Sequence, residues 1–315
     1  MRPARYGPIK LVNRNLTRFA WLSIAAAIVT IGLKSGAYFL TGSVGLLSDA
    51  AESVVNLIAA VVALIALSVA ARPADDKHHF GHAKAEYFSA VVEGIMIFVA
   101  AVFIIYSAVE RFLNPQPIEN VGIGLGVSLI ASVINGLVAW KLISVGRANR
   151  SITLVADGKH LLTDVWTSAG VVVGVLLVAL TGWIRLDPVI AFLVGLNIIW
   201  TGYHLISQSV DGLMDKTFPD EDNATLVATL QELTTDEVHF HGVRTREAGH
   251  QRFITLHMLV PGEWTVQKGH DLAEQVEERL TEKFEHVDIE VHIEPTEDPR
   301  SFEQNMAGLE VPPVS

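Results

Sequence analysis

Six long apolar stretches constrain what this chain can fold into. A helix needs about 20 apolar residues to cross the hydrocarbon core of a bilayer, and each stretch is longer than that. We place them at Thr17–Leu40, Val44–Ala71, Tyr87–Leu113, Val121–Ile143, Ile152–Thr181 and Pro188–Leu213. The pattern predicts an α-helical membrane protein with six transmembrane helices that lie in a lipid bilayer. A soluble bundle of unusually apolar helices is the alternative, and six spans of this length argue against it.

Basic residues are distributed unequally between the two sides of these stretches. Eleven Lys and Arg residues lie on one side, against Arg111 and Arg185 on the other. The eleven are Arg2, Arg5, Lys10, Arg14, Arg18, Arg72, Lys77, Lys84, Lys141, Arg147 and Arg150. Because cytoplasmic loops carry the excess of basic residues, both termini are predicted to lie in the cytoplasm.

Charge and hydropathy divide the chain into parts. The formal net charge is −11, and residues 214–315 alone carry 22 acidic and 8 basic side chains. We expect a transmembrane domain over 1–213, a cytoplasmic domain over 214–298 and a flexible tail over 299–315. An acidic surface concentrates cations, and no nucleic-acid partner is expected. Cysteine is absent, which excludes disulfides and thiolate metal sites.

The segment 214–298 alternates between helical and strand patterns. Its predicted elements are a helix over Ala224–Leu233, strands over Val238–Arg246 and Arg252–Val260, a helix over Val266–Phe284 and a strand over Val287–Ile293. Ala248-Gly249-His250 separates the first two strands and predicts a hairpin. The order α-β-β-α-β predicts a small two-layer α+β domain.

Polar side chains interrupt two of the apolar stretches with the same spacing. Each has an Asp, a ligand-type residue three positions on, and another four further. They are Asp49, Glu52 and Asn56 in the second stretch and Asp157, His160 and Asp164 in the fifth. Ionisable groups inside a membrane are costly and indicate function. Since positions i and i+4 share a helix face, two facing pairs form a four-coordinate site of the kind zinc prefers.

A buried hydrogen-bond network is the alternative interpretation of these polar groups. It would join the two helices, with Lys159 as a counter-charge. For any single residue this interpretation stays open, but four polar groups at mid-membrane depth are too expensive as simple connectors. The matched quartet therefore favours a metal site.

Two further histidine-bearing segments have spacings that suit a cation. Asp75, His78 and His82 lie in the loop after the second stretch, where a solvated loop is an equally good interpretation. Seven of the 12 histidines fall after residue 213. The residues of interest there are His241, His257, His270, His292 and Glu294. His292 and Glu294 are two apart on a strand and face the same way, and metal binding and an ordinary surface both remain open.

Motifs along the chain resemble those of the cation diffusion facilitator family of metal–proton antiporters, of the bacterial zinc-exporter type. They are Gly42-Ser43, Leu46-Leu47-Ser48-Asp49, Pro73-Ala-Asp-Asp, His78, Phe80-Gly81-His82, Lys84-Ala85-Glu86, Ala156-Asp157, His160, Asp164, Arg244-Thr245-Arg246, Arg252-Phe253-Ile254 and His257. The resemblance covers nearly the whole chain, as far as Pro295. It implies a homodimer that alternates between inward- and outward-facing states in the cell (inner) membrane, with a metallochaperone-like cytoplasmic domain.

The resemblance also implies three metal sites. The transport site matches Glu52, Asn56, His160 and Asp164. The loop site matches Asp75, His78 and His82. The cytoplasmic site, which bridges two subunits in relatives, matches His241, His257, His270, His292 and Glu294. Lys84 and Asp215 occupy the positions of a charge interlock at the dimer hinge, and Asp49 and Asp157 are candidates for holding the ligands in place or for a purely structural role.

Two departures from the family pattern bear on the identity of the metal. Zinc-transporting relatives usually have Asp or His at the position of Glu52 and Asp at that of Asn56. We expect Zn²⁺ with Fe²⁺ second, while Mn²⁺ and Co²⁺ stay open. Since ligands must be deprotonated to coordinate, protons are the expected counter-ion, carried by His160 and Asp164.

Other classes of protein are weighed against metal efflux. A membrane-anchored metal sensor without transport would not need the quartet inside the membrane. An intramembrane metallohydrolase would need an activating base, and no His-Glu-x-x-His motif is present. We therefore expect a secondary active transporter and not an enzyme.

Overall fold

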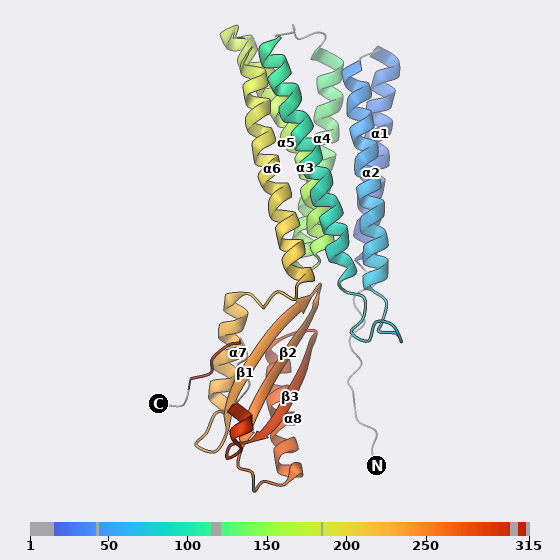
Figure 1. Ribbon diagram of the computed structural model, residues 1–315. Helices are drawn as coiled ribbons and strands as arrows, with labels where there is room; N and C mark the ends of the chain where they lie inside the picture. Colours follow the sequence, from blue (N-terminus) through green and yellow to red (C-terminus); the bar gives the residue numbers. More distant parts are fainter. Residues whose placement is uncertain (1–15, 42–43, 115–120, 184, 303–307, 313–315) are drawn as a thin grey trace. The chain divides into compact units, whose positions relative to one another are not determined.

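The computed structural model describes residues 16–41, 44–114, 121–183, 185–302 and 308–312 (Figure 1). Within these ranges, side chains are not described for residues 40, 41, 44–52, 121–125, 171, 172, 174–176, 178, 179 and 187. The chain forms two compact units that divide between Asp211 and Gly212, and each is described by itself.

The first unit consists of long helices that run side by side (Figure 1). They are α1 (Thr17–Thr41), α2 (Val44–Ala70), α3 (Ala85–Leu113), α4 (Val121–Ala148), α5 (Ile152–Thr181) and α6 (Leu186–Leu213). The helical fold expected from the apolar stretches is confirmed. The largest difference is at the end of α4, which continues five residues beyond the predicted Ile143 because Ser144–Ala148 keeps helical geometry into the connector.

Five of these helices are long and apolar enough to cross a membrane, counting described residues only. The spans are Thr17–Phe39, Ser53–Ala70, Ala85–Leu113, Gly126–Ala148 and Pro188–Leu213. The count leaves out α5, a helix of 30 residues that also carries buried polar groups. Large apolar side chains such as Trp140 and Trp200 point outward, as expected of faces that meet lipid.

Glycines bring α4 and α5 into close antiparallel contact. A Cβ on Gly158 would lie 2.6 Å from Cγ1 of Ile143, and one on Gly146 would lie 2.9 Å from the backbone nitrogen of Val155. From the first contact to the second, the chain advances three residues on α4, from Ile143 to Gly146, and goes back three on α5, from Gly158 to Val155. The two helices therefore run antiparallel. Small residues at helix interfaces permit this close approach of backbones in membranes.

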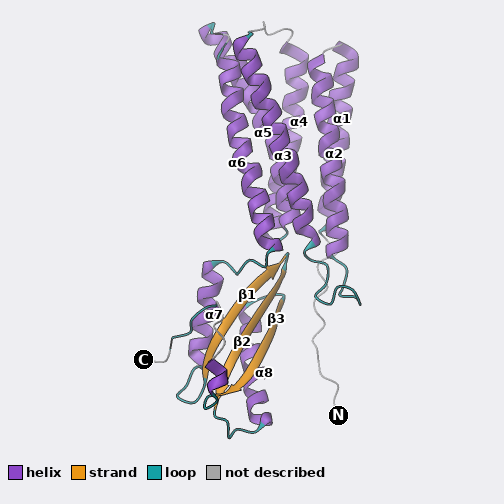
Figure 2. Ribbon diagram, in the orientation of Figure 1, coloured by secondary structure: helices purple, strands orange, loops and turns teal. Residues whose placement is uncertain are grey.

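The second unit has the predicted α-β-β-α-β order. Its elements are α7 (Asp220–Leu233), β1 (His239–Ala248), β2 (Gln251–Val260), α8 (Val266–Lys283) and β3 (Val287–Pro295). The strand order is β1-β2-β3, with β1 and β2 antiparallel and β2 and β3 parallel (Figure 2). Both helices pack against the sheet through one apolar core, in which Leu226, Leu256 and Val276 are fully buried.

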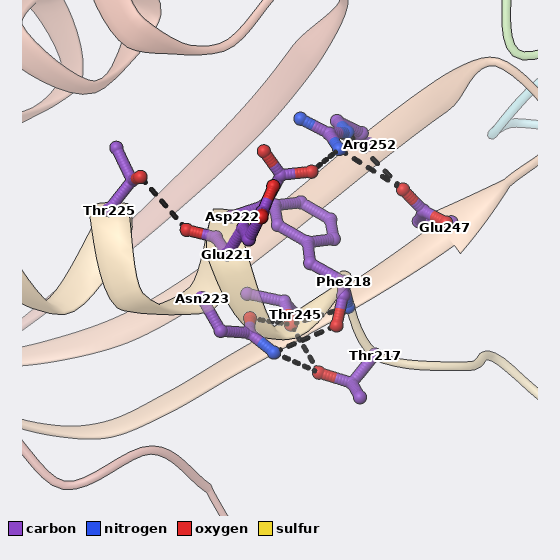
Figure 3. Close-up of polar contacts among 9 residues, drawn as sticks. All are labelled: Thr217, Phe218, Glu221, Asp222, Asn223, Thr225, Thr245, Glu247 and Arg252. Carbon is purple, nitrogen blue, oxygen red and sulfur yellow. Dashed lines mark hydrogen bonds and ion pairs between the residues drawn. The ribbon is translucent and has the colours of Figure 1, made fainter.

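The start of α7 is fastened to the sheet by polar contacts (Figure 3). Arg252 forms ion pairs with Asp222 and, at 3.3 Å, with Glu247, and its guanidinium lies 4.6 Å from the ring centroid of Phe218. The side chain of Arg252 is only 3% exposed. The two carboxylates and the face of the aromatic ring offset the free-energy cost of burying the positive charge of Arg252.

Part of the segment after Pro299 contacts the rest of the second unit. Residues Pro299–Phe302 form a 3₁₀ turn, and the backbone nitrogen of Leu309 donates to the carbonyl oxygen of Val243 at 2.8 Å. Leu309 and Val311 pack against the core of the second unit. Leu309 thereby forms a short bridge beside β1, and the flexible tail over 299–315 stays a prediction. Residues 303–307 and 313–315 lie outside the described part.

Candidate metal sites

The first candidate site lies inside the helical unit, where α2 and α5 face each other. The amide nitrogen Nδ2 of Asn56 donates a hydrogen bond to Oδ2 of Asp164, although the two residues are 108 positions apart. Asn56, His160 and Asp164 are all buried. The structure thus brings Asn56 and Asp164 together, and His160 lies about one helical turn before Asp164 on α5. The side chains of Glu52 and Asp49 lie outside the described part of α2.

Asn135 on α4 joins this site and was missed from the sequence. Its Nδ2 donates to the same Oδ2 of Asp164 at 3.1 Å, and the side chain is 1% exposed. A search for ionisable residues in apolar stretches overlooks a neutral amide. The sequence does contain a signal for Asn135. An amide side chain inside an apolar stretch needs a hydrogen-bond partner, and that partner must lie on another helix or be a ligand.

Several ligand-type atoms in this region have no hydrogen-bond partner among the described residues. They are both ring nitrogens of His160 and the Oδ1 atoms of Asn56 and Asn135. A buried polar atom without a partner is costly, and such atoms in a native fold call for an explanation such as a bound ion. One imidazole nitrogen of His160, two amide oxygens and a carboxylate form a donor set that suits a divalent transition metal.

Asp157 and Glu93 are also buried in the helical unit. Ser23 on α1 donates to Oδ1 of Asp157 at 3.1 Å, so Asp157 is tied to α1. Glu93 on α3, also missed from the sequence, accepts from Ser89 at 2.9 Å and is fully buried. The contact with Ser23 is compatible with either interpretation of Asp157, as a support for the ligands or as a structural group.

The second candidate site is the loop between α2 and α3. Nδ1 of His78 lies 3.1 Å from Oδ1 of Asp75, and Nε2 of His82 lies 3.4 Å from Oδ2 of the same carboxylate. One ligand atom from each residue falls within 4.8 Å of the others. The backbone N–H of Lys77, together with hydrogen bonds from His78, holds the pKa of Asp75 below its usual value. The carboxylate is therefore ionised and available to a cation near neutral pH.

The third candidate site lies on the sheet of the second unit. His241, His257 and His292 occupy one cross-strand row, because His241 pairs with His257 and His257 with His292. Oε2 of Glu294 lies 2.9 Å from Nε2 of His241 and 3.0 Å from Nδ1 of His257. Nε2 of His292 lies 3.5 Å from Oε1 of Glu294. Three of the five predicted residues, all histidines, contact the carboxylate of a fourth, Glu294.

The fifth predicted residue, His270, does not join this cluster within the described chain. It lies on α8 with an exposed side chain, and its Nε2 is 3.8 Å from Oε1 of Glu274, one helical turn away. A contribution from His270 to this chain's own site is not found; a contribution to the site of a second copy stays a prediction.

The charge state of Glu294 suits a cation ligand. Burial by itself would raise the pKa of Glu294, but hydrogen bonds from His257 and His241 outweigh it and hold the pKa below the usual value. The carboxylate is therefore ionised at neutral pH, where neutral imidazoles also coordinate metals.

The predicted hinge residues lie in different units. Asp215 has a positive φ of 60° and forms an ion pair with Arg246 at 3.1 Å inside the second unit. Lys84 immediately precedes α3. Their interlock stays a prediction.

The chain belongs to the cation diffusion facilitator family of cation-efflux transporters. Residues 20–214 match the cation efflux transmembrane domain, and residues 218–296 match the cytoplasmic domain of cation efflux proteins. It is accordingly a multi-pass membrane protein that transports metal cations, as the resemblance of its motifs implied.

Two relatives match this chain over most of its length, and one solved structure resembles part of it. An uncharacterized transporter of Synechocystis sp. is 52% identical over 90% of this chain and 92% of its own length. The cation-efflux pump FieF of Klebsiella pneumoniae subsp. pneumoniae is 29% identical over 90% of this chain and 94% of its own. A solved structure of CzrB in its zinc form is 30% identical, covers 26% of this chain and 93% of its own, and has a TM-score of 0.25.

Proposed function

We propose that the protein exports a divalent transition metal, Zn²⁺ first and Fe²⁺ second, by antiport against protons. The observation that carries the proposal is the contact of Asn56 with Asp164 beside His160, whose two ring nitrogens have no partner among the described residues. With Glu52 from the same helix as Asn56, these side chains form the transport site.

Competition between metal and protons supplies the coupling. A ligand must be deprotonated to coordinate, so metal and protons exclude each other at His160 and Asp164. Metal enters from the cytoplasm when these groups carry few protons and leaves on the other side as protons replace it. Asn56 does not titrate, and it therefore sets geometry and selectivity but not the number of protons exchanged.

The proposed working form is a homodimer in the cell (inner) membrane with both termini in the cytoplasm. The match to a cation-efflux cytoplasmic domain and the cluster around Glu294 support this form. Metal bound by His241, His257 and Glu294 would offset part of the acidic charge of that domain. It would thereby draw two copies together and bias the helical unit toward one state.

Flux measurements in proteoliposomes test the proposal. The purified chain is reconstituted with a pH gradient, and uptake of Zn²⁺, Fe²⁺, Mn²⁺ and Co²⁺ is followed separately. We expect zinc flux that collapses with the gradient and in Asp164→Ala, but survives in Ser132→Ala. Ser132 is the matched control, because it donates only to the carbonyl of Ser128 on its own helix.

The metals that move decide between the candidate functions. Flux of Fe²⁺ or Mn²⁺ with little Zn²⁺ would show that Glu52 and Asn56 retune the site, and zinc would be the wrong cargo. Flux that ignores the pH gradient would exclude antiport. Absence of flux for every metal, with metal still bound at Glu294, would favour a membrane-anchored sensor.

A further inference from the structure

Asp164 is held from two helices at once, and only one of them belongs to the expected pair of ligand helices. Asn56 on α2 and Asn135 on α4 both donate to its Oδ2, the latter at 3.1 Å. Two amide donors on one carboxylate oxygen fix the orientation of the carboxylate. This arrangement joins side chains from three helices, α2, α4 and α5.

The position of Asn135 follows from how α4 packs on α5. The antiparallel register set by Gly158 and Gly146 continues to Gly136, whose added Cβ would lie 3.7 Å from Cγ2 of Val165. Asn135 and Asp164 are the immediate neighbours of this pair in their helices. Close packing therefore brings a side chain on α4 within hydrogen-bond distance of the candidate ligand.

The carbonyl oxygen of the Asn135 amide accepts no hydrogen bond from the described residues. Because Nδ2 donates to a carboxylate, the carbonyl oxygen Oδ1 is the remaining polar atom, and it is buried without a partner. The Oδ1 atom of Asn56 is also buried without a hydrogen-bond partner among the described residues. An amide oxygen inside a membrane without a partner costs free energy, which a bound cation would recover.

We propose that Asn135 is a specificity-determining residue of the transport site, which holds Asp164 and supplies a further oxygen ligand to the metal. This inference rests on the proposed function. With His160, Asp164, Asn56 and Glu52, a fifth donor raises the coordination number above the four that zinc prefers. Fe²⁺, Co²⁺ and Mn²⁺ accept more oxygen ligands, so Asn135 widens the range of cargo beyond zinc.

The substitution Asn135→Leu tests this role, since leucine has the same branched arrangement of side-chain heavy atoms but neither donates nor coordinates. The flux ratio of Co²⁺ and Fe²⁺ to Zn²⁺ is measured in proteoliposomes. We expect the ratio to fall by about ten-fold or more, with zinc flux lowered but still measurable. Asn149→Leu is the matched control, because Asn149 donates only to the carbonyl of Val145 at the end of the same helix.

The absorption spectrum of bound Co²⁺ gives a second readout that a purely structural role would not change. It is recorded in a background with His78→Ala and His257→Ala, which weakens the loop and cytoplasmic sites. Asn135→Leu should convert a weak spectrum of higher coordination into the stronger spectrum of a four-coordinate site. Asn135→Asp, which keeps an oxygen at this place, should retain the weak spectrum.

The outcomes separate this inference from the proposed function. An unchanged flux ratio and spectrum would overturn the role of Asn135, and so would an equal loss of flux for all metals with an unchanged spectrum. A parent protein that moves no metal would overturn the proposed function. The Co²⁺ spectrum would then still decide whether Asn135 coordinates.

Discussion

Oε2 of Glu294 lies 3.0 Å from Nδ1 of His257 on the neighbouring parallel strand, although the two residues are 37 positions apart. The same carboxylate also contacts His241 on the far strand at 2.9 Å. A single carboxylate thus links the two outer strands of the sheet across the middle one. Glu294, His257 and His241 are placed to bind a metal ion. Without metal, the same contacts stabilise the sheet.

Removing this carboxylate should weaken metal binding in the second unit. Glu294→Ala deletes a carboxylate that contacts both imidazoles, so we expect the zinc affinity of the cytoplasmic site to fall by more than about ten-fold. Isothermal titration with the full chain in detergent, in a His160→Ala background, measures it. His286→Ala is the control, because His286 precedes β3 and its ring contacts His250, which is not among the predicted ligands. An equal loss in both variants would contradict the site.

His270 allows a sharper version of this test. Because its side chain lies apart from the cluster within one chain, His270→Ala should leave the affinity of monomeric protein unchanged. A loss of affinity that appears only at concentrations where the protein is dimeric would mean that His270 completes the site of a second copy. A loss at all concentrations would contradict the placement of this side chain.

The stability of the metal-free second unit should depend on pH through Glu294. Its pKa in the folded state lies below the ordinary value of 4.5. Between these two values the unfolded chain binds more protons, so the stabilisation is present above pH 4.5 and disappears as the pH falls through the folded pKa. Glu294→Gln lacks this titration.

Thermal unfolding in the presence of a chelator checks this dependence. The difference in melting temperature between the parent and Glu294→Gln should shrink as the pH is lowered from 6 toward about 3. A difference that is constant over this range would show that the imidazoles of His257 and His241 do not stabilise the ionised form of Glu294.

The helices and strands of this chain were largely predictable, and the reason is physical. Apolar stretches such as Ile152–Thr181 must be helical in lipid, and the alternation in Val287–Ile293 can form only a half-buried strand. Both elements appear within two residues of the expected bounds. Periodicity sets which face of an element is buried, but it carries no information about what lies opposite that face.

The parts of the sites that were missed depend on packing between elements. Asn135 reaches Asp164 only because glycines set the register of α4 on α5. Likewise, His270 has a suitable residue type, but α8 carries it away from the row of histidines on the sheet. Pairing across strands and helices is a tertiary property, which a single sequence does not encode locally.

Arg252 should be the most sensitive charged residue of the second unit. Arg252→Met removes the partner of Asp222 and Glu247 and the cation that lies over Phe218 (Figure 3). We expect a loss of unfolding free energy of about 2–4 kcal/mol, below the fully buried case because both carboxylates are partly exposed. Arg252→Lys should lose less, since it keeps the charge but not the planar, two-partner geometry.

Denaturant unfolding of the second unit within the full chain measures these losses. Arg279→Met is the matched control, because its ion pair with Glu282 at 3.6 Å lies on the exposed face of α8. Its loss should stay within about 1 kcal/mol. Comparable losses at Arg252 and Arg279 would contradict the role assigned to the buried contacts.

Gly158 should tolerate no side chain, because α4 leaves no room for one. A Cβ at this position would lie 2.6 Å from Cγ1 of Ile143 and 3.0 Å from the carbonyl oxygen of Ala139, and the latter is backbone that yields only if the helix moves. Overpacking of this kind costs about 1–3 kcal/mol. Moving α4 would also pull Asn135 away from Asp164.

Gly158→Ala should therefore lower both the melting temperature in detergent and metal flux in proteoliposomes. Gly32→Ala on α1 is the control, because a Cβ there would meet no atom within 4 Å and alanine favours the helix. It should leave both quantities unchanged or raise the melting temperature slightly. If Gly158→Ala matches Gly32→Ala in both measurements, α4 and α5 do not pack as closely as described. The hydrogen bond between Asn135 and Asp164, which depends on that packing, would then lose its structural basis.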